Sequence, residues 1–447
     1  MCCLRKPFDS NVLAIAFLLI IFSAPSVHVR AQEKASDLDR ERGRTMLKRI
    51  KEDLKENYYD PKFHGVDIEA AFKRADEKLK DARSVGQVFG IIAQTLGELD
   101  DSHTFFIPPE RAGRTEYGWT MQVIGDRCFV TSVDEGSDAE AKGVKPGDEV
   151  VEADGFVLGR PNLWKFQYLY YALRPQPGIS VVLRSPSGEQ RQLALKAKQI
   201  EGKRFTDLDY NEWMRRVVRG ELEEKQRRDR FKSFGNELLI WKMNDFDLED
   251  VQVDGAMDRV GKHKALILDL RGNGGGWVMT IKRVLANLFE RDVKIGDQIT
   301  RKETKPEIAK SRGGKAFNGK LVVLVDSRSA SASEVLARVV QLEKRGTVIG
   351  DQTAGAVMTS LRFSDQVGLR VGVFYGVSVT VSDLIMSDGK SLEKIGVTPD
   401  EVRLPSAQDL AAGRDVVLSY AASLFGVTLD PIEAGKLFPI EIKVKRM

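Results

Sequence analysis

Hydrophobic residues recur every three or four positions in the first part of the chain, which predicts amphipathic helices between residues 38 and 100. The two apolar stripes are Met46, Leu47, Ile50 and Leu54, and then Val88, Phe89, Ile92 and Leu96. From about residue 115 the pattern changes to short runs separated by turn residues, which predict β-hairpins. One hairpin joins 119–124 to 128–133 through Gly-Asp-Arg, and another spans 181–195 with its turn at Ser-Pro-Ser-Gly.

Strands and helices alternate in the second half of the chain. The runs 265–270, 321–325 and 347–350 are apolar throughout, and helical patterns follow the first two of them. Strands that are apolar on both faces and alternate with helices are typical of a parallel sheet covered on both sides. The first of these helices is expected to place five residues on one face: Trp277, Ile281, Val284, Leu285 and Leu288.

Changes in pattern divide the chain into six segments of an α/β protein. The stretch 219–232 is dominated by charges of both signs, which favours a solvated helix or linker over a binding patch. The expected segments are a signal peptide (1–31), an N-terminal helical region (32–112), a β-rich domain (113–200), a charged helical linker (201–235), an α/β core (236–405) and a C-terminal helical and strand segment (406–447).

The N-terminus has the pattern of a secretory signal. Arg5 and Lys6 precede an apolar stretch at 12–24, and Val29-Arg30-Ala31 fits the small-residue cleavage pattern. The apolar stretch is shorter than the roughly 20 residues that a membrane span needs. We therefore expect a secreted or periplasmic protein, with an uncleaved membrane anchor as the alternative.

The charge and the cysteine and histidine content exclude several classes of function. Lys and Arg number 69 against 65 Asp and Glu, so the net charge of +4 gives no electrostatic argument for a nucleic-acid partner. After signal removal Cys128 stands alone, in a strand where we expect it to be buried and inert. The four histidines lack the spacing of a metal site. We therefore expect no metal and no organic cofactor.

Two turns at the ends of predicted strands are candidates for chemistry, because sites in open α/β sheets gather there. RGNGGG (271–276) carries four glycines, more than a simple turn needs, and could leave backbone N–H groups facing a developing negative charge. SRSASASE (327–334) places alternating serines where a helix begins. From these residues alone, small side chains that let a helix pack closely explain the second turn equally well.

In combination, four motifs resemble the C-terminal processing (tail-specific) serine peptidases. They are DLRGNGGG (269–276), VDSRSASASE (325–334), GDQTAGA (350–356) and LEKIGVTPD (392–400), and 143–155 resembles part of the PDZ domain of these enzymes. The resemblance implies a crotonase-like α/β catalytic core with an inserted PDZ-like domain. It further implies that Ser331 is the nucleophile and that the backbone amides of Gly276 and Ala332 form the oxyanion hole, with Gly275 as an alternative to Gly276.

The chain departs from the best-known branch of this family at the general base. That branch has a lysine in a GxxTxGK pattern, where this chain has Ala356. DDSHT (100–104) is similar to a second branch, the tricorn core peptidases, which implies that His103 is the base, with Ser102 and Glu393 orienting it. Ala332 replaces the aspartate of the tricorn-like enzymes, so a preference for basic substrates is not implied.

Several of these residues also have a purely structural explanation. Ser102 could cap a turn, and Glu393 could form a salt bridge with Lys390 or Lys394. Asp326 is expected to be a capping residue. The aromatic cluster 164–171 is expected to be core beneath the PDZ-like sheet, or in part to line a peptide groove.

The sequence as a whole predicts a serine endopeptidase that acts on protein or peptide substrates. The PDZ-like domain would capture their C-termini. One alternative is an inactive relative that only binds peptides, since the family lysine is missing. The other is a Ser–Lys enzyme that takes its lysine from elsewhere, for instance Lys390.

Overall fold

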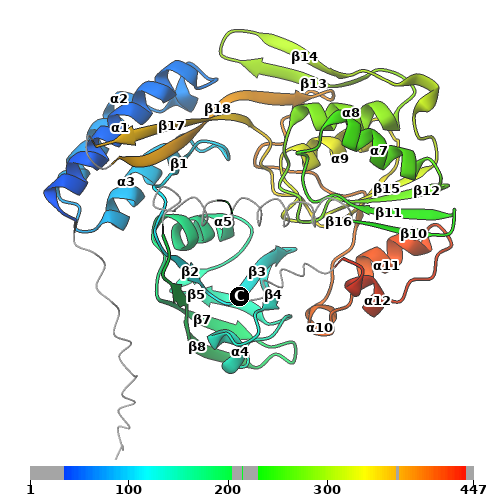
Figure 1. The fold of residues 1–447 in the computed structure, drawn as a ribbon, viewed down its shortest axis with the longest axis horizontal. Helices are drawn as coiled ribbons and strands as arrows, with labels where there is room; N and C mark the ends of the chain where they lie inside the picture. Colours follow the sequence, from blue (N-terminus) through cyan, green and yellow to red (C-terminus); the bar gives the residue numbers. More distant parts are fainter. Residues whose placement is uncertain (1–34, 204–213, 215–229, 369–371, 439–447) are drawn as a thin grey trace, which may run out of the picture. The chain divides into compact units, whose positions relative to one another are not determined.

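The computed structural model describes residues 35–203, 214, 230–368 and 372–438, shown in Figure 1. All of them belong to the second of two compact units, Gln32–Met447. The predicted signal peptide 1–31 and most of the predicted linker 201–235 lie outside the described residues, as does the end of the predicted C-terminal segment.

A six-stranded sheet forms the centre of the α/β core. Its strands lie in the order β10-β11-β12-β15-β16-β19. The pair β10–β11 is antiparallel, and every later pair is parallel. The bounds are β10 Phe231–Phe234, β11 Leu238–Lys242, β12 Ala265–Asp269, β15 Lys320–Val325, β16 Thr347–Gly350 and β19 Glu401–Val402.

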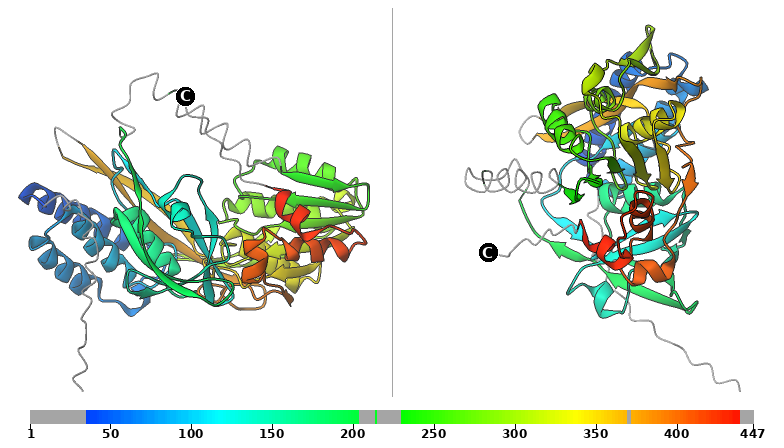
Figure 2. Two further views of the ribbon diagram at one scale, coloured as in Figure 1. Left: turned by 90° about the horizontal axis from the view of Figure 1, so that it is seen from below. Right: turned by 90° about the vertical axis from the view of Figure 1, so that its right-hand side faces the viewer.

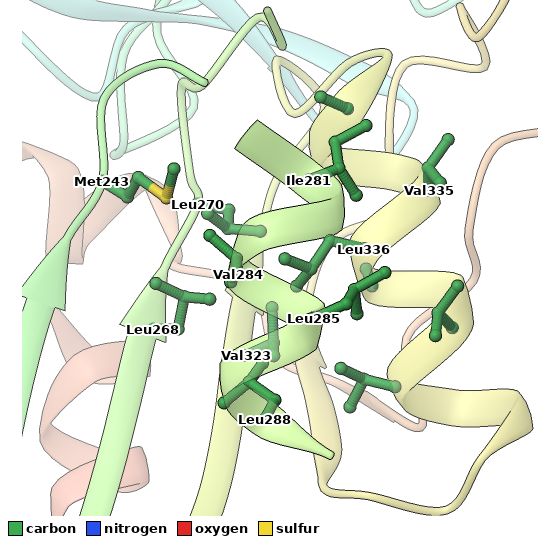
Figure 3. Close-up of a cluster of buried hydrophobic side chains, with 14 of the residues drawn as sticks. Met243, Leu268, Leu270, Ile281, Val284, Leu285, Leu288, Val323, Val335 and Leu336 are labelled. Carbon is green, nitrogen blue, oxygen red and sulfur yellow. The ribbon is translucent and has the colours of Figure 1, made fainter. Parts of the chain in front are cut away.

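Helices cover both faces of this sheet, as the uninterrupted apolar strands predict. Side chains of alternate strand residues, such as Leu268 and Val323, pack against one group of helices (Figure 3). Their neighbours Ile267 and Leu324 pack against a second group on the opposite face, coloured red in Figure 2. The first group is α7 (Asp250–Val260), α8 (Val278–Leu288) and α9 (Ala332–Leu342), and the second is α11 (Val416–Ser423) and α12 (Pro431–Lys436).

A second sheet carries the N-terminal helices. It has the order β1-β18-β13-β14, and β17 pairs with β18. One face packs against α1–α3, where Phe106 and Val377 are fully or almost fully buried. The bounds are α1 Asp37–Asn57, α2 Ile68–Lys80, α3 Val85–Gly97, β1 Phe105–Ile107, β13 Val293–Thr300, β14 Thr304–Ala309, β17 Thr359–Val367 and β18 Val373–Met386. Because β1 pairs with β18, the segment that follows α3 lies against the core.

The β-rich segment forms an antiparallel sheet of its own, in the order β3-β4-β5-β7-β8 with β6 beside β5. It contacts core loops that follow β15 and β16. Gln122 Nε2 donates to Asp326 Oδ2 at 2.8 Å, and Arg160 forms an ion pair with Asp351 at 3.0 Å. The bounds are β2 Arg114–Glu116, β3 Trp119–Ile124, β4 Arg127–Val133, α4 Asp138–Ala141, β5 Glu149–Ala153, β6 Phe156–Val157, α5 Leu163–Gln167, β7 Gly178–Arg184, β8 Gln190–Lys196 and β9 Lys198–Ile200; α10 spans Ala407–Ala411.

The structure differs from the expectations in four places. Strand β10 lies inside the expected linker 201–235, because Phe231 packs against the buried Trp241. The expected core 236–405 contains the antiparallel strands β13, β14, β17 and β18 in addition to the parallel sheet. Trp277 is 55% exposed, because α8 begins one residue later and its apolar face starts at Ile281. Within the aromatic cluster, Phe166 and Tyr170 are buried, whereas Trp164 and Tyr171 are exposed.

Candidate active site

Ser331 lies at the tip of the turn between β15 and α9. Its φ of 53° and ψ of −115° are unusual for a residue with a side chain, and such strain costs of order 1–3 kcal/mol. Two hydrogen bonds hold this conformation: Ser331 N donates to Ala356 O at 2.7 Å and to Glu334 Oε2 at 3.0 Å. A strained turn held from two sides fixes the backbone that carries the hydroxyl.

The buried carboxylate of Glu334 organises the loop that faces Ser331. It accepts hydrogen bonds from Thr353 Oγ1 at 2.6 Å, Gly355 N at 2.7 Å and Ala356 N at 2.9 Å. Burial raises the pKa of Glu334, and these donors oppose that rise. Sequence reasoning missed this residue, although an acid three residues after Ser331, in the first turn of the helix that follows, was a signal for it.

The glycine turn places open backbone amides beside Ser331. The N–H groups of Gly276 and Ala332 have no hydrogen-bond partner among the described residues, whereas Gly275 N donates to Asn273 Oδ1 at 2.8 Å. Gly276 has a φ of 147°, and a Cβ there would lie 2.6 Å from the carbonyl carbon of Phe246. Only glycine therefore fits, and the geometry supports Gly276 over Gly275 as a potential donor.

His103 lies in the loop between α3 and β1, which Asp101 shapes. Asp101 Oδ1 accepts from His103 N at 2.9 Å and Thr104 N at 2.7 Å, and Thr380 Oγ1 from β18 donates to it at 2.8 Å. Tyr58 donates to the other carboxylate oxygen at 2.8 Å. Asp101 was not predicted. Its position two residues before the histidine, where acids commonly form turns, was the available signal.

A hydrogen-bonded chain connects His103 to Glu393, which is 290 positions further along the sequence. Ser102 Oγ lies 2.6 Å from His103 Nδ1 and donates to Glu393 Oε2 at 2.9 Å. Glu393 also accepts from Ser102 N at 2.8 Å and Val357 N at 3.1 Å. Lys394 pairs with Asp100 instead, so Glu393 does not form the salt bridge that was the structural alternative.

These contacts assign the tautomer of the imidazole. An ionised carboxylate only accepts, so the Ser102 hydroxyl must donate to Glu393 and accept from the Nδ1–H of His103. The other ring nitrogen, Nε2, is then unprotonated and has no hydrogen-bond partner in the described part of the chain. Burial lowers the pKa of His103, and the charge of Asp101 opposes this only in part. The ring is therefore neutral near pH 7.

His103 and Ser331 line the same cavity, which has a volume of about 250 Å³. Gly276 and Ala332, whose amides are open, line it as well, and most of its remaining wall is apolar. No hydrogen bond joins the imidazole to the serine hydroxyl within the described residues. Of the sequence-predicted residues, His103, Gly276, Ser331 and Ala332 thus line one cavity, and Ser102 and Glu393 are connected to it through His103.

The comparisons with known proteins relate this chain to peptidases. Residues 238–403 match the sequence model of the family described as peptidase family S41. The chloroplastic C-terminal processing peptidase of Tetradesmus obliquus is 27% identical over 376 residues, which are 77% of this chain and 73% of that protein. The carboxy-terminal processing protease CtpA of Bacillus subtilis (strain 168) is 23% identical over 409 residues, 86% of this chain and 74% of that protein. The chain is a serine-type peptidase related to the C-terminal processing proteases.

Solved structures resemble this peptidase in fold. Mature CPAF has a TM-score of 0.62 at 15% identity, with 84% of this chain and 94% of that chain covered. A second structure, mature CPAF complexed with lactacystin, also has a TM-score of 0.62 and covers 90% of this chain and 99% of that chain. At this identity the likeness supports the mixed α/β fold.

Ala356 stands where the resemblance to the lysine-dependent branch leads one to expect a lysine, and its backbone contacts Ser331 and Glu334. No lysine is among the residues that line the cavity, as far as the structure describes the chain. Lys390 belongs to an exposed turn, where its N–H donates to Asp388. Lys242 is half-buried, and its ammonium forms an ion pair with Asp269 at 3.1 Å.

Three further features concern metal binding, membranes and thiol chemistry. Among the described residues of the peptidase, no three His, Cys, Asp or Glu side chains are grouped so that they could hold a metal ion. None of its described helices has the length and hydropathy that crossing a bilayer requires. Cys128 is buried, and burial raises its pKa to about 12, which keeps the thiol unreactive.

Proposed function

We propose that this peptidase is a secreted endopeptidase in which Ser331 is the nucleophile and His103 is the general base. Glu393 and Ser102 orient His103, and the amides of Gly276 and Ala332 form the oxyanion hole. The observation that carries the proposal is the chain from Glu393 through Ser102 to Nδ1 of His103, at 2.9 Å and 2.6 Å. This chain of hydrogen bonds leaves Nε2 of His103 unprotonated, and the imidazole lines the same cavity as Ser331.

The proposed reaction begins when Ser331 Oγ attacks the carbonyl carbon of the scissile peptide bond. Nε2 of His103 takes the hydroxyl proton, and the two open amides donate to the oxygen that becomes negative. The tetrahedral intermediate collapses, and His103 returns the proton to the leaving amine. Water, activated by the same imidazole, then attacks the acyl-enzyme and releases the second product.

Glu393 stabilises the imidazolium that forms during both steps. Its carboxylate is held by three donors, two of which belong to Ser102, so it keeps its position when the ring becomes charged. Burial raises the pKa of Glu393, and these donors counteract the rise and favour the ionised form.

We further propose that residues 113–200 form a PDZ-like domain that captures substrate C-termini. Support comes from the antiparallel sheet in this segment and from the printed names of the relatives, which describe C-terminal processing. Secretion is supported by the charged and apolar pattern of residues 1–31.

A fluorophosphonate probe tests the proposed nucleophile, because only an activated serine reacts with it. We expect wild-type protein to be labelled at Ser331 and to cleave denatured casein, and we expect Ser331→Ala to lose both properties. A well-folded wild type that neither labels nor cleaves would support the peptide-binding alternative.

The base is tested by comparing two variants. We expect His103→Ala to lose labelling and cleavage, and Lys390→Ala to keep them. If Lys390→Ala is inactive and His103→Ala is fully active, the assignment of the base is wrong and the Ser–Lys alternative holds.

A further inference from the structure

The first turn of α8 exposes three consecutive apolar side chains. Trp277 is 55% exposed, Val278 38% and Met279 71%, and we call these three residues the apolar platform. Single exposed apolar residues are common on soluble proteins. An exposed tryptophan and an exposed methionine within three residues of each other are less usual, because both residue types concentrate at interfaces.

The core does not need the apolar platform. The buried face of α8 is complete without it, since Ile281, Val284, Leu285 and Leu288 already recur at helical spacing toward the sheet (Figure 3). The apolar periodicity from which a buried Trp277 was predicted is therefore accounted for by Ile281, Val284, Leu285 and Leu288.

The backbone beneath the apolar platform is held firmly. Trp277 N donates to Phe246 O at 3.0 Å, and Phe246 N donates to Gly275 O at 2.9 Å. Thr280 is buried one residue after Met279, and its hydroxyl donates to Leu248 O at 2.6 Å. The backbone that carries the exposed side chains is thus already ordered. A ligand that contacts them would lose little free energy in ordering this segment.

The middle residue of the apolar platform reaches the active-site cavity. Val278 lines the cavity together with Ser331 and His103. Gly276, which offers an open amide to that cavity, directly precedes Trp277. The apolar platform therefore starts directly after one residue of the cavity wall, Gly276, and contributes another, Val278.

We propose that the apolar platform binds an apolar side chain of the substrate next to the scissile bond and so determines where the chain cuts. This inference rests on the proposed function of Ser331 and adds a specificity site to it. The occupant is an aliphatic or aromatic residue of an extended substrate. Buried tryptophans at interfaces often contribute most of the binding energy, which makes Trp277 the principal contact.

The test compares cleavage preferences of the wild type and of two variants. Trp277→Ala removes the principal contact, and Phe374→Ala is the matched control, since Phe374 is an equally exposed aromatic residue (56%) on β18. Each protein is incubated with a library of unstructured peptides, and the cut sites are identified by mass spectrometry. Peptides with leucine or glycine at the preferred position then give kcat/KM.

We expect the wild type to prefer an apolar residue at one fixed position within three residues of the cut. Trp277→Ala should lose about tenfold in kcat/KM on the leucine peptide and little on the glycine peptide. Fluorophosphonate labelling of Ser331 should stay within about twofold of wild type, because the nucleophile is intact. Phe374→Ala should behave as wild type in every assay.

The inference is overturned if Trp277→Ala keeps the wild-type preference and rate, or if it loses the same factor on both peptides. These outcomes are separate from a failure of the proposed function, which would show as absent cleavage and labelling in the wild type itself.

Discussion

Replacing Glu393 by glutamine would keep the size of the side chain and remove its negative charge. The carboxylate now accepts from Ser102 N, Ser102 Oγ and Val357 N, through both of its oxygens. A glutamine amide has one accepting oxygen and one donating NH₂ group. In either orientation the NH₂ group therefore faces a backbone N–H. The hydrogen-bonded chain that runs from residue 393 through Ser102 to His103 is disturbed as a result.

The size of the effect follows from the distance between the charge and the ring. Two hydrogen bonds in series, 2.6 Å and 2.9 Å long, keep Glu393 Oε2 within 5.5 Å of His103 Nδ1. At an effective dielectric constant of about 20, two unit charges at that separation attract each other by about 3 kcal/mol. The neutral ring of the ground state does not feel this attraction, whereas the imidazolium of the transition state does. We therefore expect kcat to fall roughly 100-fold.

The assay is the hydrolysis of a peptide cut by the wild type, with kcat and KM measured separately. KM should change little, since Glu393 is not among the residues that line the cavity. Glu401→Gln removes the same charge from β19 and serves as the control. Thermal and urea unfolding show whether both variants are folded. A Glu393→Gln protein that is folded and retains kcat within about threefold of wild type would refute the proposed role of the carboxylate.

Three further predictions concern pH, an ion pair and the core. Because burial lowers the pKa of His103, kcat/KM should rise with pH and reach half its maximum below pH 6.5; a midpoint above pH 7 would contradict this. Lys394→Gln breaks the exposed pair with Asp100 that joins the loops of His103 and Glu393, so activity should fall by at most about fivefold at low salt and by less in 1 M salt. An equal loss at both salt concentrations would argue against an electrostatic cause. Leu268→Ala, at a fully buried position of β12, should lower the free energy of unfolding in urea by about 2–5 kcal/mol. A loss below about 1 kcal/mol would show that the neighbouring core side chains close the space left by the leucine.

The sequence predicted the parallel sheet and its helices because those strands are apolar on both faces. The strands of the second sheet were harder to recognise. β17 and β14 each have only one buried residue, so their sequences carry little of the period that marks a strand. Trp277 shows the converse difficulty. Its spacing fits the apolar face of α8, but the spacing does not reveal that the helix begins one residue later, at Val278.

The candidate site could be assembled from motifs, but its supporting contacts could not. Ser331, His103 and Glu393 were found because each lies in a stretch that resembles a known peptidase branch. Glu334 holds its loop through backbone donors from the next loop of the core, Gly355 N and Ala356 N, and Asp101 shapes its own turn through His103 N and Thr104 N. Side-chain bonds to backbone groups leave no trace in the identity of the donor residue, so the sequence alone could not indicate these contacts.

The central claim is that an imidazole from the N-terminal region activates a serine of the core. The most direct test is the second-order rate constant for fluorophosphonate labelling of His103→Ala, measured between pH 5 and 8 beside the wild type. The account predicts a wild-type rate that follows one ionisation below pH 6.5, and a variant rate at least about 100-fold lower that no longer follows it. Labelling of the folded variant at the wild-type rate would contradict the account.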